Sequence, residues 1–362
     1  MVFMNEKIKC LREKLRGLDI QGMIISNPVN VKYLTGIDGE GTLLITRKEN
    51  YYITDARYIE SVRATLTIDD EIIVSNYTDI SEYDYENFFS FCENVGFEEE
   101  YITYATYKRY MQKYKANHLE ETESIIEKQR LIKDEQEIEY LERACELTDN
   151  CFSHLLNFIK IGMTEKQIAF EIEKYFLDHG AEGLAFETIV ASGPNSSKPH
   201  AITTERKIDV GDPITIDFGC KYKGYCSDMT RTVFIGEVSD RAREVYNVVL
   251  EANLRGIAAA KPGNRMCDVD LAARNYIEEK GFGEYFTHRT GHSIGLEDHE
   301  FGDVSSVNTD IIKVGQCFSV EPGIYLPDEN IGVRIEDLVL ITEDGCEVLN
   351  DYTKELIVVP EE

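Results

Sequence analysis

The run PITIDFGCKYKGYCSDMTRTVF, residues 213–234, has the pattern of two strands joined by a turn, with one acid on each side of that turn. Ile214 and Ile216 alternate with polar residues, so Asp217 faces away from the apolar side of its strand. Antiparallel pairing would bring Asp217 and Asp228 to the same end of a sheet. Because burying two acids there costs free energy, the run predicts a candidate functional site as well as a hairpin.

A second run, FSVEPGIYLPDENIGVRIEDLVLI at residues 318–341, repeats this arrangement with Glu321 and Glu336. Between the two runs lies HRTGHSIGLEDHE, residues 288–300, whose three histidines stand among glycines that favour a loop over a helix. Any one acid in a chain with 67 of them is usually solvated or a helix cap. Several acids on neighbouring apolar strands repel one another unless cations neutralise them, so the set predicts a two-metal site.

The types of ligand narrow the choice of metal. Structural zinc prefers Cys and His, and the chain has no Cys-x2-Cys or paired Cys-His spacing. Four carboxylates and one imidazole suit two divalent ions, Mn2+ first, with Co2+, Fe2+ or Zn2+ as other occupants. Two such ions can share a water molecule, lower its pKa and hold both sides of a tetrahedral intermediate, which is the chemistry of hydrolysis.

The pattern of helices and strands predicts two domains, 1–127 and 128–362, in an α/β (α+β) fold. The first alternates helices (4–17, from Asn27-Pro28, 55–65, 81–95) with strands (22–26, 42–46, 51–55, 71–75). The second begins with a long helix and then reads helix, helix, strands twice over, in halves at about 130–238 and 239–355, with helices at 240–260 and 266–281. Such a repeat predicts a pseudo-twofold sheet in which acids from each half meet in a central cleft.

At these residues the chain resembles a known family. The phrases IDFG, SDMTRT, TGHSIGL, VEPGIY and VRIED are similar to the pita-bread metallopeptidases, and within them to the Xaa-Pro group of proline dipeptidase (prolidase) and aminopeptidase P. The segment NPVNVKYLTG resembles the amino-terminal creatinase-like domain of that group. The resemblance implies a dinuclear-metal exopeptidase that hydrolyses the bond before proline in a peptide, acting as a homodimer.

The resemblance also implies a role for each metal ligand. Asp217 would bind one ion, Asp228 and Glu336 would bridge the two, and His292 and Glu321 would complete the second. A metal-bridging hydroxide would attack the scissile carbonyl, and Glu321 would carry the proton to the leaving nitrogen.

The same resemblance implies substrate-side roles for the remaining residues of the site. His288 and His299 match positions beside the substrate, and His200 matches a further histidine of the prolyl-specific group. Arg334 would pair with a ligand carboxylate and hold it in place. Asp298 and Ser293 depart from the usual family pattern beside the pocket, which leaves the substrate preference open.

Composition limits the partners. The formal charge of −29 argues against nucleic acid or an anionic membrane, because phosphates would be repelled. No run approaches eighteen apolar residues, and the amphipathic start with Leu11 and Leu15 predicts a helix and not a signal peptide. Nine cysteines without framework spacing fit reduced thiols in a cytoplasm, although Cys220 and Cys226 flank a turn and could pair if oxidised.

Other functions of the same fold compete with the prolyl peptidase. A methionine aminopeptidase and a metal-free creatinase-like hydrolase are the runners-up, and a non-catalytic binding relative is the third class. The complete set of five ligands argues against the last two, and the large amino-terminal domain with His200, His299 and Arg334 argues against the first. The choice between dipeptidase and aminopeptidase activity stays open, although the short length of the chain favours the dipeptidase.

Overall fold

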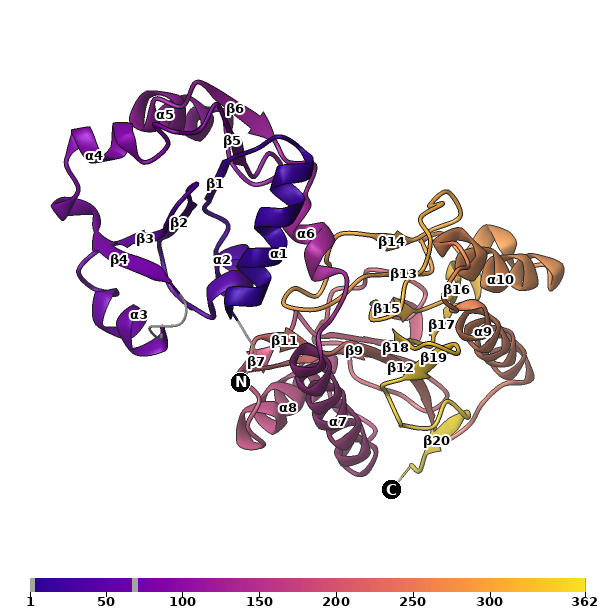
Figure 1. Cartoon of the computed structure of the whole chain (residues 1–362). Helices are drawn as coiled ribbons and strands as arrows, with labels where there is room; N and C mark the ends of the chain where they lie inside the picture. Colours follow the sequence, from indigo (N-terminus) through magenta and orange to yellow (C-terminus); the bar gives the residue numbers. More distant parts are fainter. Residues whose placement is uncertain (1–3, 67–70, 362) are drawn as a thin grey trace. The chain divides into compact units, whose positions relative to one another are not determined.

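The computed structural model describes residues 4–66 and 71–361. It divides the chain into two compact units, Met1–Arg130 and Leu131–Glu362, coloured from indigo to magenta and from magenta to yellow in Figure 1. The boundary between the units falls at 130/131, whereas the sequence places it at 127/128. Among the described residues, no helix is both long and apolar enough to cross a membrane.

The first unit is built on one six-stranded mixed sheet with the strand order β4-β3-β2-β1-β5-β6. Its strands are β1 (Gly22–Ile25), β2 (Thr42–Ile45), β3 (Asn50–Thr54), β4 (Ile72–Asn76), β5 (Asn94–Phe97) and β6 (His118–Glu121). Its helices are α1 (Met4–Gly17), α2 (Pro28–Thr35), α3 (Ile59–Thr65), α4 (Glu82–Asn87), α5 (Tyr104–Tyr114) and α6 (Ile125–Arg130). The α/β prediction for this part of the chain is therefore confirmed.

Two helices of this unit are shorter than predicted, and local hydrogen bonds give the reason. Helix α3 starts at Ile59 and not at 55, because the Asp55 carboxylate accepts from the backbone N–H of Arg57 at 2.7 Å and closes a turn there. Helix α4 ends at Asn87 and not at 95, because the chain turns to bury Phe89, whose carbonyl accepts from the N–H of Cys92 at 2.8 Å.

The second unit contains four α-helices among its described residues, α7 (Glu135–Phe158), α8 (Glu165–Asp178), α9 (Asp240–Ala259) and α10 (Met266–Glu279). Its strands are β7 (Gly183–Leu184), β8 (Ile189–Ser192), β9 (Pro213–Phe218), β10 (Cys220–Tyr222), β11 (Tyr225–Cys226), β12 (Met229–Ile235), β13 (Gly291–His292), β14 (Asp303–Val304), β15 (Cys317–Val320), β16 (Gly323–Leu326), β17 (Ile331–Arg334), β18 (Asp337–Ile341), β19 (Cys346–Val348) and β20 (Ile357–Val359). The order helix, helix, strands, repeated once, is the predicted pita-bread architecture.

Each predicted hairpin is a pair of antiparallel strands that encloses a smaller pair. Strands β9 and β12 form the outer pair of the first, with Thr230 opposite Asp217, and β10 and β11 form its inner pair. In the second, β15 pairs with β18 and encloses β16 and β17. The acids Asp228, Glu321 and Glu336 lie at the steps between outer and inner strands, where the chain leaves one ladder and enters the next.

In each half of the second unit, a pair of helices packs against the strands through buried apolar side chains. Helices α7 and α8 contribute Leu155 and Phe176 to a buried cluster with Ile216 of β9. Helices α9 and α10 pack against β16 and β17 in a second cluster that includes Ile277 and Val333. The two helix pairs therefore lie on opposite sides of the strands, as Figure 1 shows.

Candidate metal centre

One cavity of about 370 Å³ collects every side chain that the sequence predicts for the site. Its lining includes His200, Asp217, Asp228, His288, His292, His299, Glu321, Arg334 and Glu336. Phe186, Ile189 and Pro199 add an apolar wall, and Arg289 and Asp298 complete the polar lining. The three other histidines of the chain, His118, His154 and His179, lie outside this cavity.

The two halves are joined at this point by hydrogen bonds between β12 and the end of β17 with the residues that follow it. The N–H of Glu336 donates to the carbonyl of Thr230 at 3.1 Å, and the Thr230 hydroxyl donates to Oε2 of Glu336 at 2.6 Å. The N–H of Arg334 donates to the hydroxyl of Thr232 at 3.1 Å. Carboxylates that are about a hundred positions apart in the sequence therefore share one buried space.

The geometry at the bottom of the cavity suits a cation. Asp228, His292 and Glu336 are all buried, and each offers one ligand atom within 4.8 Å of the others. Nε2 of His292 lies 3.5 Å from Oδ2 of Asp228 and 3.5 Å from Oε1 of Glu321. An imidazole nitrogen and several carboxylate oxygens converging in this way match the donors that divalent transition metals prefer.

Unpartnered oxygens test whether these residues fit a metal. Among the described residues, four buried carboxylate oxygens accept no hydrogen bond, and three of them line this cavity: Oδ1 of Asp217, Oδ1 of Asp228 and Oε1 of Glu336. A buried oxygen without a partner costs free energy, so such groups call for an unseen partner. Bound cations would satisfy all three, and the residues therefore fit the metal ions that the family implies.

The electrostatics of the cavity agree with that fit. Burial, together with neighbouring carboxylates, raises the pKa of Asp228 and of Glu336 well above their usual range. Burial raises the pKa of Glu321 to about 7, with a smaller contribution from Asp217. These carboxylates resist ionisation because their charges repel in a poorly solvated space, and positive ions would remove that resistance.

The orientation of His292 leaves one nitrogen free for a ligand role. Its Nδ1 lies 3.3 Å from the carbonyl of Ser293, an acceptor that requires Nδ1 to carry the proton. The lone pair of Nε2 then points toward the carboxylates. Burial, with a contribution from His299, whose ring centroid lies 3.8 Å away, lowers the pKa of His292 to about 3, so the ring is neutral as a metal ligand must be.

Arg334 connects Asp217 to His288 by way of Tyr325. Its Nη2 forms an ion pair with Oδ2 of Asp217 at 2.6 Å, which leaves Oδ1 of that acid directed elsewhere. Its Nε donates to the Thr230 hydroxyl at 3.1 Å, and its Nη1 donates to the Tyr325 hydroxyl at 2.9 Å. The Tyr325 hydroxyl can then donate to Nε2 of His288 at 2.9 Å.

The backbone carbonyl bonded to His288 determines where the protons lie in the series Arg334, Tyr325 and His288. Nδ1 of His288 lies 2.7 Å from the carbonyl of Arg289 and must donate to it. Burial, with a contribution from Arg334, lowers the pKa of His288 to about 4, so the ring stays neutral. His299, more exposed, lies 3.3 Å from Nη2 of Arg289, and its pKa is lowered by partial burial. His200 is exposed at the rim.

Three parts of the site lie outside the sequence prediction. Thr230 bonds both Glu336 and Arg334, and Tyr325 joins Arg334 to His288. Alternation does place Thr230 on the same side of its strand as Asp228, which was the available signal. The apolar wall of Phe186 and Ile189 carries no local signal, because apolar residues in this part of the chain do not differ in pattern from those of the core.

The buried cluster of acids and one histidine, set between the two halves of the second unit, fits a metal centre, and comparison with known proteins gives the family. Residues 139–343 match metallopeptidase family M24, and residues 7–132 match the creatinase/prolidase N-terminal domain. The chain belongs to metallopeptidase family M24, and its architecture is that of the pita-bread Xaa-Pro peptidases.

Relatives extend over almost the entire chain. An uncharacterized peptidase of Bacillus subtilis, YqhT, is 40% identical over 355 residues, which are 98% of this chain and 100% of the relative. The structure of an Xaa-Pro dipeptidase from Bacillus anthracis superposes with a TM-score of 0.93 at 38% identity, covering 98% of this chain and 100% of that one. The structure of an X-Pro aminopeptidase from Thermotoga maritima superposes with a TM-score of 0.87 at 35% identity, covering 96% of this chain and 100% of that one.

Proposed function

We propose that this metallopeptidase hydrolyses Xaa-Pro peptide bonds and that it is a dipeptidase. The observation that carries the proposal is the convergence of four acids and His292 in one cavity, with three carboxylate oxygens unpartnered among the described residues. The creatinase/prolidase N-terminal match and the Xaa-Pro relatives favour prolyl substrates over methionine. The short length of the chain favours the dipeptidase over the aminopeptidase.

In this proposal two divalent ions, Mn2+ first, are held by Asp217, Asp228, His292, Glu321 and Glu336. When bound, they would supply an activated water and polarise the scissile carbonyl. The remaining steps belong to side chains of the chain itself. Arg334 orients Asp217 through their ion pair. Glu321 takes up the proton that the attacking water releases and delivers it to the leaving nitrogen.

The histidines then act on the substrate. His288 is neutral and fixed by Tyr325, so it offers a rigid edge to the substrate and no charge. His299 lies against His292 and beside the acids, within reach of a carbonyl bound there. Phe186 and Ile189 supply the apolar wall that a proline ring would contact.

Chelation and substrate comparison test the proposal. Protein stripped of metal should regain cleavage of Gly-Pro or Ala-Pro when Mn2+ is added, and inertness toward every Xaa-Pro peptide with metal bound would refute it. A parallel series with Ala-Pro, Ala-Pro-Xaa and a methionyl peptide, each with Mn2+, Co2+ or Zn2+, distinguishes the alternatives. Cleavage of the tripeptide alone would assign an aminopeptidase, and cleavage of the methionyl peptide alone would assign a methionine aminopeptidase.

The family resemblance extends the proposal to assembly and compartment. We propose a homodimer that works in the cytoplasm, where the free cysteines found in the structure would remain reduced. Light scattering should give about twice the chain mass of 41.4 kDa, and a stable monomer in active enzyme would contradict the dimer.

A further inference from the structure

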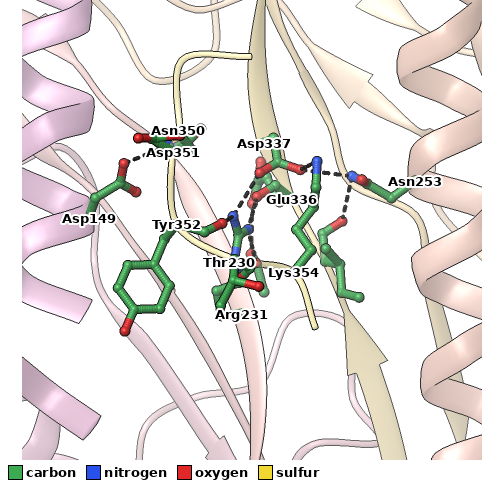
Figure 2. A network of polar contacts seen from close by, with 12 residues as sticks. Asp149, Thr230, Arg231, Asn253, Glu336, Asp337, Asn350, Asp351, Tyr352 and Lys354 are labelled. Atoms are coloured by element: carbon green, nitrogen blue, oxygen red, sulfur yellow. Dashed lines mark hydrogen bonds and ion pairs between the residues drawn. The ribbon is translucent and has the colours of Figure 1, made fainter. Parts of the chain in front are cut away.

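A buried ion pair lies behind the predicted metal ligands, on the side away from the cavity. Arg231 and Asp337 have side chains only 2% and 0% exposed, and Nη2 of the arginine lies 2.7 Å from Oδ1 of the acid. Figure 2 shows the network around them. The other N–H groups of Arg231 donate to backbone carbonyls, at 3.0 Å to Thr230, 2.5 Å to Glu336, 3.0 Å to Tyr352 and 3.3 Å to Thr353. All five donors of the guanidinium are thereby used.

The second oxygen of Asp337 receives two further donors. Nζ of Lys354 lies 2.9 Å from Oδ2, and Nδ2 of Asn253 on α9 lies 3.2 Å from it. The same Asn253 amide donates to the carbonyl of Val320 at 2.9 Å. One acid therefore holds together two strands, a long helix and the segment of residues 350–354.

The backbone groups that this network holds belong to the predicted ligands or to their neighbours. Glu336 is itself a predicted bridging ligand, and Val320 directly precedes Glu321. Thr230 follows Asp228 by two positions, and its hydroxyl reaches Oε2 of Glu336 at 2.6 Å. The network thus touches the main chain beside three of the four acids.

Electrostatics explain why a charged network is placed here. Four carboxylates converge in one cavity and repel one another when ionised, so holding their strands in place requires bonds from outside the cavity. A buried ion pair contributes little net stability compared with apolar packing of the same volume. Unlike apolar packing, the ion pair makes directional hydrogen bonds, and each of them fixes the position of one backbone carbonyl. Hydrogen-bond partners outside a metal site orient the metal ligands in this way.

The segment of residues 350–354 closes the network from the carboxyl-terminal side. Oδ1 of Asn350 accepts from the N–H of Leu338 at 2.7 Å, and the N–H of Asp351 donates to Oδ2 of Asp149 on α7 at 2.7 Å. Because Lys354 also pairs with Asp337, the segment is bonded to its surroundings at both of its ends. It fills the space behind the ligands without reaching the cavity lining.

We propose that Arg231 and Asp337 are positioning residues for the metal ligands, above all Glu336, and that residues 350–354 are a required part of this support. The inference rests on the proposed function, since it takes Glu336 as a ligand. It assigns a role in metal retention to a part of the chain that contacts neither metal nor substrate.

The test measures metal affinity apart from activity. Mn2+ binding to metal-stripped protein is followed by calorimetry for the wild type, Asp337→Asn, Lys354→Met and Lys354→Arg, with thermal unfolding of each metal-free protein in parallel. Asp337→Asn places an amide donor against Arg231 or Lys354 and should weaken binding about 10–100-fold. Lys354→Met should weaken it about 10-fold, toward the lower end of that range, and Lys354→Arg should restore it.

A matched control separates positioning from general destabilisation. Leu155→Ala removes a fully buried side chain of α7 that does not line the cavity, so it should lower the unfolding temperature and leave Mn2+ affinity unchanged. If Asp337→Asn and Lys354→Met bind Mn2+ as tightly as the wild type and only their unfolding temperatures fall, as in Leu155→Ala, the positioning role is refuted. The proposed function would still stand. Absence of Mn2+ binding in the wild type would instead overturn the proposed function. If Asp337→Asn fails to fold, the comparison of Mn2+ affinity between Lys354→Met and Lys354→Arg tests the inference.

Discussion

Replacing Glu321 by glutamine should have opposite effects on the metal-free and the metal-loaded protein. In the metal-free cavity, burial raises the pKa of this carboxyl from about 4.5 to about 7. A carboxyl with a raised pKa in the folded state keeps its proton there after the unfolded chain has lost it. Its contribution to stability is therefore complete below about 4.5 and is lost as the pH rises through about 7.

The size of the effect follows from the same pKa. A difference of roughly 2.5 pKa units corresponds to about 3 kcal/mol at 1.36 kcal/mol per unit. Because Glu321→Gln cannot ionise, metal-free variant at pH 8 should be more stable than metal-free wild type by about that amount. At pH 4.5 the two should differ little.

Urea unfolding in the presence of a chelator, at pH 4.5 and at pH 8, measures both differences. Adding Mn2+ at pH 8 should reverse the order, since the variant lacks one ligand oxygen and gains less binding free energy. Turnover of Ala-Pro should be lost in the variant. A metal-free Glu321→Gln that is less stable than the wild type at pH 8 would refute the reasoning, because it would mean that burial does not penalise the ionised Glu321 carboxylate.

Three further changes separate the parts of the site. Asp228→Ala should abolish both turnover and tight Mn2+ binding, and retained turnover would contradict its bridging role. His299→Ala should lower turnover strongly while metal content, measured by atomic emission, stays at the wild-type level; loss of metal would make it a ligand instead. Thr230→Val removes the hydroxyl that bonds Glu336 and Arg334, so Mn2+ affinity should fall about 10-fold with an unchanged circular dichroism spectrum, and unchanged affinity would remove Thr230 from the support of the site.

Local patterns were sufficient to predict most of the fold. Alternation identified β9 and β12, and Asn27, from which a helix was predicted, caps α2 in the structure. Capping and alternation depend on neighbours within a few residues, so the sequence carries them directly. The ends of α3 and α4 were predicted less well, because a side-chain turn at Asp55 and the burial of Phe89 override helix propensity there.

The sequence by itself identified the acids of the two hairpins and the histidines of the loop between them, and with them the resemblance to a metallopeptidase family. Only the tertiary structure decided that Thr230 would bond Glu336, 106 positions away, and that Arg231 would hold that residue from behind. Periodicity fixes which face of a strand a side chain takes, but it contains no information about which distant strand lies opposite. That choice depends on how α7 to α10 pack, because the apolar clusters on the two sides bring the halves together and make one cavity out of separate acids.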